Sequence, residues 1–405
     1  MRILIHTQYF PPETGAPQNR LYDLACELSR LEHEIVVLTA MPNYPTGRIF
    51  PGYSGGFRKE VGNGFITYRT PIIPAQSAAL LPRLASYFSF VISSLLVGLF
   101  LPRPDVIFTE SPPLFLGISG YLLSRVKRTR WIFNVADLWP DSAVELGIIR
   151  KNSLAHRISQ QMETFFYRKA WLVTGQSKSI LSAIQYRSPN ARTYHLSNGV
   201  QVDQYIPQER TRGSNQPLCV MYAGLHGLAQ GLDQIITAAA SLDQDAFQFL
   251  LVGAGPEKSA LIQQARDLNV CNVTFLDPVP RDKMPALLTQ ADMIIVPLRI
   301  QLTGAVPSKL YEAMAAGKPI VLIAQSEAAE IVRAANCGLT VEPGDTAALK
   351  NAIVALMVDP QRRIQLGVNG RKYVETWFNR RAIVHAFSKF LVSSLRFAED
   401  EVNKP

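Results

Sequence analysis

Short hydrophobic runs and amphipathic stretches alternate along almost the whole chain. The runs are rich in β-branched residues and predict buried strands at residues 3–6, 35–39, 65–69, 106–109, 131–135, 172–174, 219–222, 247–252, 273–276, 293–296, 320–323 and 339–341. Stretches with a helical period lie between them and predict helices at residues 19–31, 232–241, 256–268 and 309–316. Strands that alternate with helices form parallel sheets covered on both faces, so the pattern predicts an α/β fold.

The strands fall into two series, which predicts two doubly wound domains. A chain of 405 residues is also too long for one ordinary hydrophobic core. We expect the first domain at residues 1–200 and the boundary in the polar stretch 201–217. Ligands bind outside the carboxyl ends of the strands in such sheets, so the cleft between two such domains is the expected site.

One segment departs from this pattern. No charged residue occurs at residues 84–102, and an arginine stands on each side. The segment is long enough to span a bilayer, but a single crossing would put two parts of one sheet on opposite sides of the membrane. A buried helix, a re-entrant hairpin and a helix in the membrane interface remain as alternatives. We favour a membrane-associated helix that makes contact through Phe88, Phe90 and Leu95.

The charge of the chain points to an anionic partner for the first half. Residues 1–200 contain 21 Lys and Arg against 12 Asp and Glu, whereas the second half is neutral. Acidic lipid, a lipid-linked phosphate or nucleic acid would be attracted by this surplus, although ordinary solubility charge explains it equally well. Because the uncharged segment lies in the same half, we expect an anionic membrane surface and no nucleic acid. Isolated cysteines and a start unlike a signal peptide predict a cytoplasmic protein, peripheral on the inner face of the cell membrane.

Glycine-containing loops follow three of the expected strands. Gly15 precedes the first helix, Gly224 follows the seventh strand, and Gly253 and Gly255 follow the eighth. Glycine lets the backbone approach a ligand closely, and a helix N-terminus favours an anion, although each loop taken alone is better explained as a tight turn. Lys258 stands where a dinucleotide fingerprint has its third glycine, so NAD binding is not expected.

Residues 297–319 carry the most specific signal. They read PLRIQLTGAVPSKLYEAMAAGKP and place a loop before a helix that begins near Ser308. A serine N-cap, free backbone N–H groups and Lys309 in the first turn form a site for a diphosphate. Glu312, one turn further along, can accept two hydrogen bonds from a ribose diol, and its apolar neighbours are a poor setting for a mere surface glutamate.

Further motifs extend this signal over essentially the whole chain. They are YFPPETGAP near the start, DLWPDSAVELG, LSNGVQVDQY, YAGLHGLAQGLD, LLVGAGPEKSAL, PSKLYEAMAAGKPIV and CGLTVEPGD. In this order they resemble glycosyltransferase family 4, in its bacterial cell-surface polysaccharide branch with the colanic acid transferases and the L-fucosamine transferases of O-antigen synthesis. The resemblance implies a GT-B fold: the first domain binds the acceptor, residues 201–375 bind a nucleotide sugar, and residues 376–405 form a helix that returns to the first domain.

The resemblance also implies roles for single residues. Those that bind the donor would be Gly15, Gly224, Gln230, Gly253, Gly255, Ser308, Lys309 and Glu312. Ser308 and Lys309 would hold the diphosphate, and Glu312 the ribose. Asp137 would orient the acceptor hydroxyl or accept its proton, which makes Asp137 and Lys309 the expected catalytic residues.

Several positions differ from the family pattern. The family pattern has a second glutamate eight residues before Glu312, and Gly304 stands at that position. Leu225 and Gln230 replace an arginine and a lysine that are common in the family, so neutralisation of the diphosphate falls mainly on Lys309. Ala136 replaces a common histidine, which leaves the following aspartate as the best polar candidate on the acceptor side.

We therefore expect a retaining, metal-independent glycosyltransferase with no cofactor, a UDP-, GDP- or dTDP-linked sugar as donor, and a lipid-linked saccharide as acceptor. The nucleoside diphosphate would leave while the acceptor attacks the same face, and the lysine and helix N-termini would stabilise the departing charge. Two alternatives are a nucleotide-sugar 2-epimerase, which shares two such domains, and a non-enzymatic, membrane-associated module that binds sugars or lipid carriers. The epimerase would not need the apolar segment or the basic first half. An NAD oxidoreductase ranks last.

Overall fold

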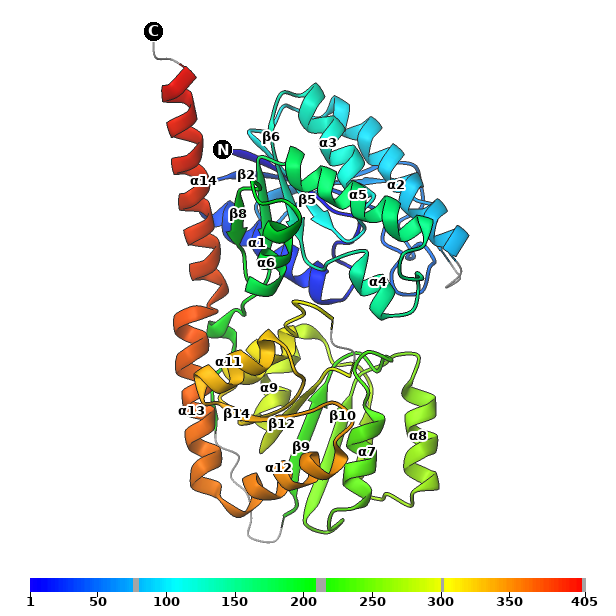
Figure 1. Cartoon of the computed structure of the whole chain (residues 1–405), viewed down its shortest axis with the longest axis vertical. Coiled ribbons are helices and arrows are strands. Elements are labelled where there is room, and N and C mark those ends of the chain that lie inside the picture. The colour runs from blue at the N-terminus through cyan, green and yellow to red at the C-terminus, as the bar shows by residue number, and fades with distance from the viewer. Residues whose placement is uncertain (76–79, 209–215, 300–301, 403–405) are drawn as a thin grey trace. The chain divides into compact units, whose positions relative to one another are not determined.

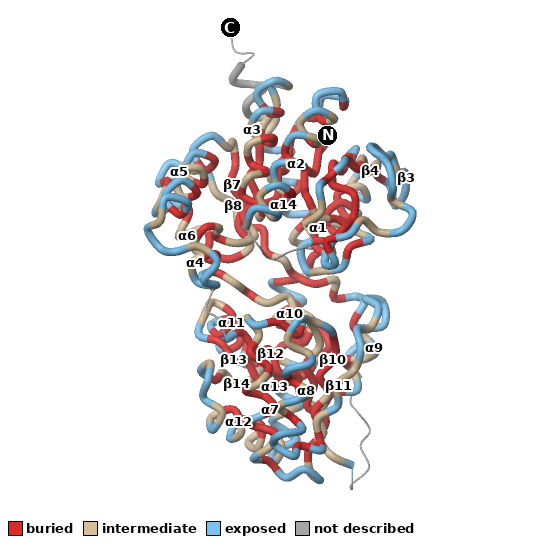
Figure 2. The backbone as a smooth tube through the Cα atoms, turned by 90° about the vertical axis from the view of Figure 1, so that its right-hand side faces the viewer, coloured by how far each residue is buried: buried red, intermediate tan, exposed pale blue. Residues whose placement is uncertain are grey.

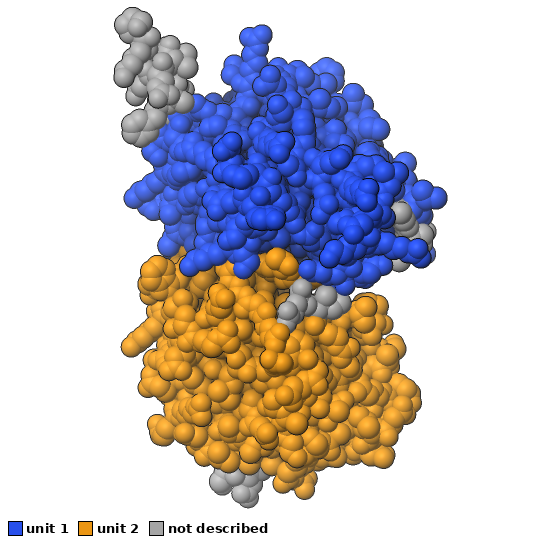
Figure 3. Space-filling view, in the orientation of Figure 1, with its two compact units in different colours: residues 1–197, 381–405 blue, residues 198–380 orange. Residues whose placement is uncertain are grey.

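The computed structural model describes residues 1–75, 80–208, 216–299 and 302–402 and divides the chain into two compact units. Unit 1 comprises residues 1–197 and 381–405, and unit 2 comprises residues 198–380 (Figure 3). The division precedes the polar stretch where we expected it. The reason is that Val200 pairs with Asn379, and that Val202 and Tyr205 are buried in the core of unit 2.

Unit 1 is built on an eight-stranded sheet with the order β3-β4-β2-β1-β5-β6-β7-β8 (Figure 1). Its strands are β1 (Arg2–His6), β2 (Glu34–Ala40), β3 (Arg58–Gly62), β4 (Phe65–Thr70), β5 (Val106–Ser111), β6 (Arg130–Val135), β7 (Leu172–Gly175) and β8 (Thr193–His195). All neighbours are parallel except β3 and β4, which form an antiparallel pair at the edge. The expectation of a purely parallel sheet was therefore wrong at this edge. Hydrophobic patterning did not predict β3, because RKEVG contains no hydrophobic run.

The helices of unit 1 cover both faces of this sheet. They are α1 (Ala16–Arg30), α2 (Leu80–Phe100), α3 (Leu116–Val126), α4 (Asp141–Glu145), α5 (Leu154–Lys169), α6 (Lys178–Arg187) and α14 (Arg380–Val402). Ile3 and Ile5 of β1 pack in one cluster with residues of α1 and α14, whereas Leu4 packs in another with residues of α3 and α5. The last helix of the chain thus contributes to the core of unit 1.

Unit 2 has a six-stranded parallel sheet with the order β11-β10-β9-β12-β13-β14. Its strands are β9 (Leu218–Ala223), β10 (Phe247–Val252), β11 (Val273–Leu276), β12 (Met293–Pro297), β13 (Ile320–Ile323) and β14 (Gly338–Val341). Its helices are α7 (Asp233–Ala240), α8 (Lys258–Asp267), α9 (Met284–Thr289), α10 (Ser308–Ala315), α11 (Glu327–Ala335), α12 (Thr346–Val358) and α13 (Pro360–Trp377), with short 3₁₀ helices at Val202–Gln204 and Arg281–Lys283. The central strands are buried in both units (Figure 2), as helices on both faces require.

The uncharged segment forms the single continuous helix α2. A hairpin is therefore excluded, and the helix starts early enough to include Arg83. Residues before and after α2 belong to the same sheet, as the argument against a single membrane crossing assumed. The stretch Leu81–Phe100 is apolar and long enough to cross a membrane by length and composition, with a mean hydropathy of 1.6, and 28% of it is buried. The wholly buried alternative is therefore wrong as well.

Candidate functional site

The sheet of unit 2 has a topological switch point between β9 and β12. From β9 the chain proceeds to β10 and β11 on one side, and then returns to β12 on the other side. At such a point the loops that follow the two central strands diverge and leave a crevice outside the carboxyl ends of the strands. The loop after β9 and the loop that leads from β12 into α10 both start there. The first loop and α10 together contain five of the eight residues expected to bind the donor, namely Gly224, Gln230, Ser308, Lys309 and Glu312.

The glycines of unit 2 allow two loops to lie directly against each other. The Gly224 N–H donates to the Val252 carbonyl at 2.8 Å, and the His226 N–H donates to the Ala254 carbonyl at 2.9 Å. A Cβ on Gly253 would lie 1.9 Å from the Gly224 oxygen, and one on Gly255 would lie 2.2 Å from the His226 oxygen. Any larger residue would force the loops apart. The immediate role of Gly253 and Gly255 is thus close loop packing.

Lys258 holds the same loop from the other side. Its Nζ donates to the carbonyls of Gly253 and Leu276 at 2.9 and 3.0 Å and pairs with Asp277 at 2.8 Å. The residue that breaks the dinucleotide fingerprint therefore stabilises the glycine loop by binding its carbonyl oxygens. The sequence alone did not indicate this role.

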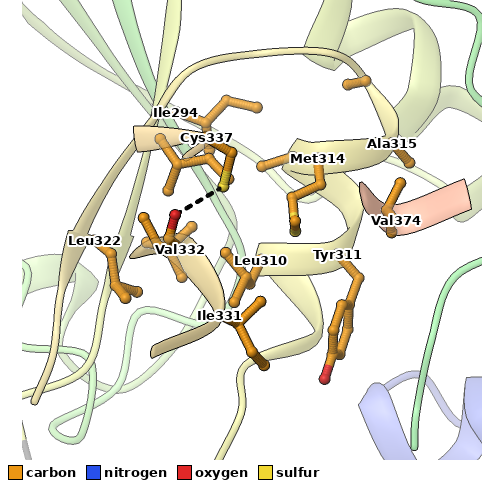
Figure 4. Packing of buried hydrophobic residues seen from close by; sticks show 14 of the residues in the cluster. Ile294, Leu310, Tyr311, Met314, Ala315, Leu322, Ile331, Val332, Cys337 and Val374 are labelled. Atoms are coloured by element: carbon orange, nitrogen blue, oxygen red, sulfur yellow. Dashed lines mark hydrogen bonds between the residues drawn. The ribbon is translucent and has the colours of Figure 1, made fainter. Parts of the chain in front are cut away.

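Lys309 and Glu312 lie on the side of α10 away from its core contacts. Leu310, Tyr311 and Met314 point into the hydrophobic cluster of unit 2 (Figure 4). Lys309 and Glu312 are half-buried, and within the described parts of the chain neither side chain has a hydrogen bond or an ion pair. Burial lowers the pKa of Lys309 and raises that of Glu312, and each charge partly offsets the shift of the other. Half-buried charges without partners are suited to a charged ligand.

Gly224 and Tyr222 make room for the Lys309 side chain. A Cβ on Gly224 would lie 1.8 Å from Lys309 Cε, and the φ of this glycine is +155°. The Lys309 Nζ stands 5.8 Å from the centre of the Tyr222 ring, and the Tyr222 hydroxyl donates to the Leu225 carbonyl at 2.6 Å. The aromatic ring thus faces the ammonium group, a favourable arrangement. The position of Tyr222 near the carboxyl end of β9 was the signal that could have identified it.

Two expected donor residues differ from their predicted geometry. Pro307, not Ser308, is the N-cap of α10, and no side chain caps the helix. The serine N-cap was therefore wrong: Ser308 is the first helical residue, and the N–H groups of the first turn lack a side-chain acceptor. The Oε1 atom of Gln230 is buried without a hydrogen-bond donor from the described residues, while a Cβ on Gly227 would come within 2.8 Å of it.

Asp137 lies just beyond the carboxyl end of β6 in unit 1. Asp137 is half-buried. Burial raises the pKa of Asp137 and the nearby Asp141 adds to the rise, whereas the Ser142 hydroxyl and the Leu138 N–H close to the carboxylate oppose it. A carboxylate in such a setting can hold a hydroxyl group or take up its proton.

Gly15 is the N-cap of α1 at the switch point between β1 and β5. Its backbone is extended, with φ of 166°, so its conformation does not require glycine. A Cβ would lie 2.4 Å from Gln18 Oε1, but this atom is the end of a flexible side chain that can move away, so space does not require glycine either.

The sequence analysis did not predict a buried hydrogen-bond network near the carboxyl ends of the strands of unit 1. Arg20 pairs with Glu110, Asn134 Nδ2 donates to the same carboxylate at 2.7 Å, and the Thr174 hydroxyl donates to Asn134 at 2.6 Å. The residues come from α1, β5, β6 and β7, so they meet only in the folded chain. This hydrogen-bond network connects the carboxyl-terminal ends of β5, β6 and β7 to α1.

Comparison with known proteins agrees with this architecture. The model for the glycosyl transferase 4-like domain matches residues 15–199, and the model for glycosyl transferases group 1 matches residues 204–373. A colanic acid biosynthesis glycosyl transferase of Escherichia coli, WcaI, is 25% identical over 96% of this chain and 98% of its own length. A GDP-mannose-dependent phosphatidylinositol monomannoside mannosyltransferase of Mycolicibacterium smegmatis is 30% identical over 47% of this chain and 53% of its own.

The solved structure of Anabaena HepE in complex with UDP-glucose has a similar fold. It superposes with a TM-score of 0.72 at 19% identity and covers 97% of this chain and all of its own. The two α/β domains with parallel sheets define a GT-B glycosyltransferase fold. The chain belongs to the glycosyltransferases that combine the 4-like and group 1 domains.

Proposed function

We propose that this glycosyltransferase transfers a sugar, with retention of configuration and without a metal ion, from a nucleoside-diphosphate sugar to a lipid-linked saccharide. The proposed setting is cell-surface polysaccharide synthesis, including O-antigen, on the inner face of the cell membrane. The observation that carries the proposal is the pair Lys309 and Glu312, half-buried beside the glycine loops without protein partners among the described residues.

The donor chemistry follows from these groups. Lys309 and the uncapped first turn of α10 would bind the diphosphate, and Glu312 would accept hydrogen bonds from the ribose hydroxyls. As the bond between the anomeric carbon and the phosphate oxygen breaks, negative charge grows on the leaving group next to the lysine. A preorganised cation is most effective there, because it does not have to reorganise during the reaction.

Asp137 is the proposed contact to the acceptor. The acceptor oxygen forms its new bond to the anomeric carbon on the face that the diphosphate leaves, and its proton passes to the Asp137 carboxylate or to the departing phosphate. The raised pKa of Asp137 favours proton uptake.

The surface of α2 supports the membrane part of the proposal. Leu81, Phe88, Ile92, Leu96 and Phe100 are 77, 40, 58, 55 and 89% exposed. Their spacings of seven and then four residues place them in one apolar stripe along the helix. Such a stripe on a surface helix is typical of contact with a membrane interface.

The residues expected to make this contact need correction. Phe88 lies on the stripe, but Phe90 is fully buried in the core and Leu95 is partly buried and packs against it. Substitution of Phe90 or Leu95 would therefore disturb folding. The exposed residues Ile92, Leu96 and Phe100 are the appropriate test set.

Basic side chains gather at the carboxyl end of the stripe. Lys127 Nζ donates to the carbonyls of Leu99 and Leu101 at 3.0 and 2.6 Å, and Arg103 donates to the Arg128 carbonyl at 2.8 Å. These bonds bring cations from the end of α3 to the end of α2. An apolar stripe with cations at its end fits anionic lipid.

A vesicle-flotation experiment tests the membrane part. The protein should float with phosphatidylglycerol vesicles and less with phosphatidylcholine, and high salt should release only part of it. The triple variant Ile92→Ser, Leu96→Ser and Phe100→Ser should no longer float. Serine at Val358, Val368 and Trp377, exposed residues of unit 2, is the matched control and should leave it unchanged. A wild-type protein that ignores anionic vesicles would contradict membrane association.

The transfer itself is tested by incubation with UDP-, GDP- and dTDP-sugars and lipid-linked acceptor, with mass spectrometry of the products. One donor should yield an acceptor enlarged by one sugar residue. An epimerised nucleotide sugar formed without acceptor would favour the 2-epimerase. Tight binding with no product from any donor would favour a binding module.

A further inference from the structure

The N-terminal end of α2 lies on the side of the unit 1 sheet where the strands have their carboxyl ends. Asp137, the proposed acceptor contact, lies on the same side. The His6 ring on β1 hydrogen-bonds to Ser94 at 3.0 Å and lies 5.9 Å from the Phe90 ring. The Ile73 N–H, beyond the end of β4, donates to Ser89 at 2.9 Å. The helix therefore runs antiparallel to the strands, as a crossover helix does, and its first turns extend past their carboxyl ends. Arg83 lies in these first turns.

Three tyrosines surround this end of the helix. Tyr87 follows Arg83 by one turn on the same helix face. Tyr9 follows β1, and its ring is 5.6 Å from that of Tyr44, edge to face. Burial raises the pKa of the Tyr9 hydroxyl, Tyr87 and Glu13 raise it further, and the Arg83 guanidinium opposes them, so each of these groups lies within electrostatic range of the Tyr9 hydroxyl.

The polar ends of these residues have no partner in the part of the chain that the structure describes. Within residues 1–75, 80–208, 216–299 and 302–402, no hydrogen bond or ion pair is formed by the Arg83 guanidinium or by the hydroxyls of Tyr9, Tyr44 and Tyr87. Arg83, Tyr9 and Tyr87 are half-buried, and Tyr44 is 39% exposed. A half-buried guanidinium among phenol hydroxyls without partners is a site prepared for an oxygen-rich anion.

Glu13, the carboxylate in this group, is already satisfied. Its oxygens accept the N–H groups of Phe10, Asn43 and Tyr44 at 3.1, 2.7 and 2.8 Å. The nearby Arg69 also favours its charged form, against burial, which raises its pKa. Glu13 therefore shapes the loops around the site and leaves Arg83 available.

We propose that Arg83, Tyr87, Tyr9 and Tyr44 bind the phosphate group that links the acceptor saccharide to its lipid. This inference rests on the proposed transferase function. The planar guanidinium matches phosphate oxygens with two parallel N–H donors, and the phenol hydroxyls add further donors. The site lies at the same edge of the sheet as Asp137, where the saccharide hydroxyl would react.

The exposed apolar stripe of α2 does not lie on the side of the helix that carries Arg83. Leu81 and Phe88 are within five residues of Arg83, but at about 100° per residue they lie about 140–160° around the helix axis from it. The assignment to a lipid-linked rather than a free phosphate therefore follows from the proposed acceptor, and a comparison of ligands tests it.

Binding of farnesyl diphosphate, measured by equilibrium dialysis, tests the site directly. Arg83→Ala should weaken binding about 10–100-fold, as expected for the loss of hydrogen bonds to a charged group. Arg83→Lys should recover part of the loss, and Tyr87→Phe, which removes one hydroxyl, should weaken binding by about 3–10-fold. Arg157→Ala, an exposed arginine on α5, is the control and should change nothing.

Two further ligands show whether the site binds a lipid-linked phosphate, a free phosphate or the hydrocarbon alone. Inorganic diphosphate and farnesol should both bind much more weakly than farnesyl diphosphate. Equal binding of inorganic diphosphate, with the same dependence on Arg83, would overturn the lipid-linked assignment, and equal binding of farnesol would overturn the phosphate contact. An Arg83→Ala protein that loses phosphatidylglycerol vesicles but keeps farnesyl diphosphate would show a membrane contact instead.

Steady-state kinetics distinguish a failure of this phosphate site from a failure of the proposed transferase function. In transfer assays Arg83→Ala should raise the KM for acceptor and leave the KM for the nucleotide sugar unchanged. An unchanged acceptor KM in a variant with wild-type circular dichroism would overturn the site. Arg83-dependent binding of farnesyl diphosphate by an enzyme without transfer activity would retain the site and overturn the proposed function.

Discussion

Lys309 and Glu312 occupy adjacent positions on one face of α10, yet they have different tasks in the proposed reaction. The lysine faces the Tyr222 ring and the glycine loop, where the diphosphate would lie. The glutamate lies within electrostatic range of Arg380 and Arg281, which favour its charged form. A charged acceptor binds a ribose diol in the ground state, whereas a cation beside the leaving group acts mainly in the transition state.

Substitution should separate these two tasks. Lys309→Ala should lower kcat about 10²–10³-fold with a smaller change in donor affinity, because the leaving-group charge grows during the reaction. Glu312→Ala should weaken donor binding by about 1.5–3 kcal/mol through the loss of hydrogen bonds to a charged group. Steady-state kinetics and donor titration measure both effects, and Lys372→Ala on the exposed side of α13 is the control. Wild-type kinetics in both variants would contradict the donor site.

His6 gives the stability of unit 1 a dependence on pH. Burial lowers its pKa to about 3, so it stays neutral in the folded chain. The unfolded chain takes up this proton near pH 6.5, and the free energy of unfolding therefore decreases as the pH falls below that value. Between pH 6.5 and 5 the loss should be about 2 kcal/mol larger in wild type than in His6→Gln, which does not titrate.

Urea denaturation followed by tryptophan fluorescence measures this effect. Trp131, Trp139 and Trp171 lie in unit 1 and report mainly its unfolding. Parallel pH profiles for wild type and His6→Gln would show that His6 is not neutral in the fold, or that another group dominates.

At the scale of elements, three helices are joined around the loop that carries Asp137. Arg187 at the end of α6 pairs with Asp141 of α4 and with Glu163 of α5, and the Tyr167 hydroxyl donates to Glu163 at 2.6 Å. Burial raises the pKa of Glu163 to about 7, although Arg187 and Tyr167 oppose the rise. Arg187 is therefore the cation that limits this rise, and Glu163 titrates near neutral pH in the folded chain.

Arg187→Ala should destabilise unit 1 through the loss of this cation. At pH 8 the free energy of unfolding should fall by about 3 kcal/mol, the lower end of the range for a broken buried pair, because Arg187 is partly exposed. At pH 6 the loss should be smaller, since Glu163 then binds a proton and carries no unpaired charge. Urea denaturation at both pH values measures the difference. An equal loss at both would argue that packing, rather than charge, explains the effect.

Much of this element structure could be predicted from hydrophobic patterning. Each strand expected from the sequence is present, with ends that differ by one or two residues. The edge strand β3 and the short β8 could not be predicted, because neither has a buried apolar run. For the site, the pattern around Lys309 indicated the charged residues. Tyr222 and Lys258 were missed because their roles depend on contacts between separate loops.

At the scale of the whole molecule, each unit contains its own set of proposed site residues. Those of unit 2 follow β9, β10 and β12, and those of unit 1, Gly15 and Asp137, follow β1 and β6. In both sheets these are carboxyl ends of parallel strands. The exposed stripe of α2 belongs to unit 1, so the proposed acceptor site and the proposed membrane contact share one unit.

The central claim is retention without a metal ion, and NMR of the reaction product tests it most directly. The enzyme is incubated with its nucleotide sugar and lipid-linked acceptor in EDTA, and the anomeric configuration of the new linkage is determined. The product should have the anomeric configuration of the donor, and it should form at the rate measured without EDTA. An inverted linkage, or loss of activity in EDTA that added metal restores, would contradict it.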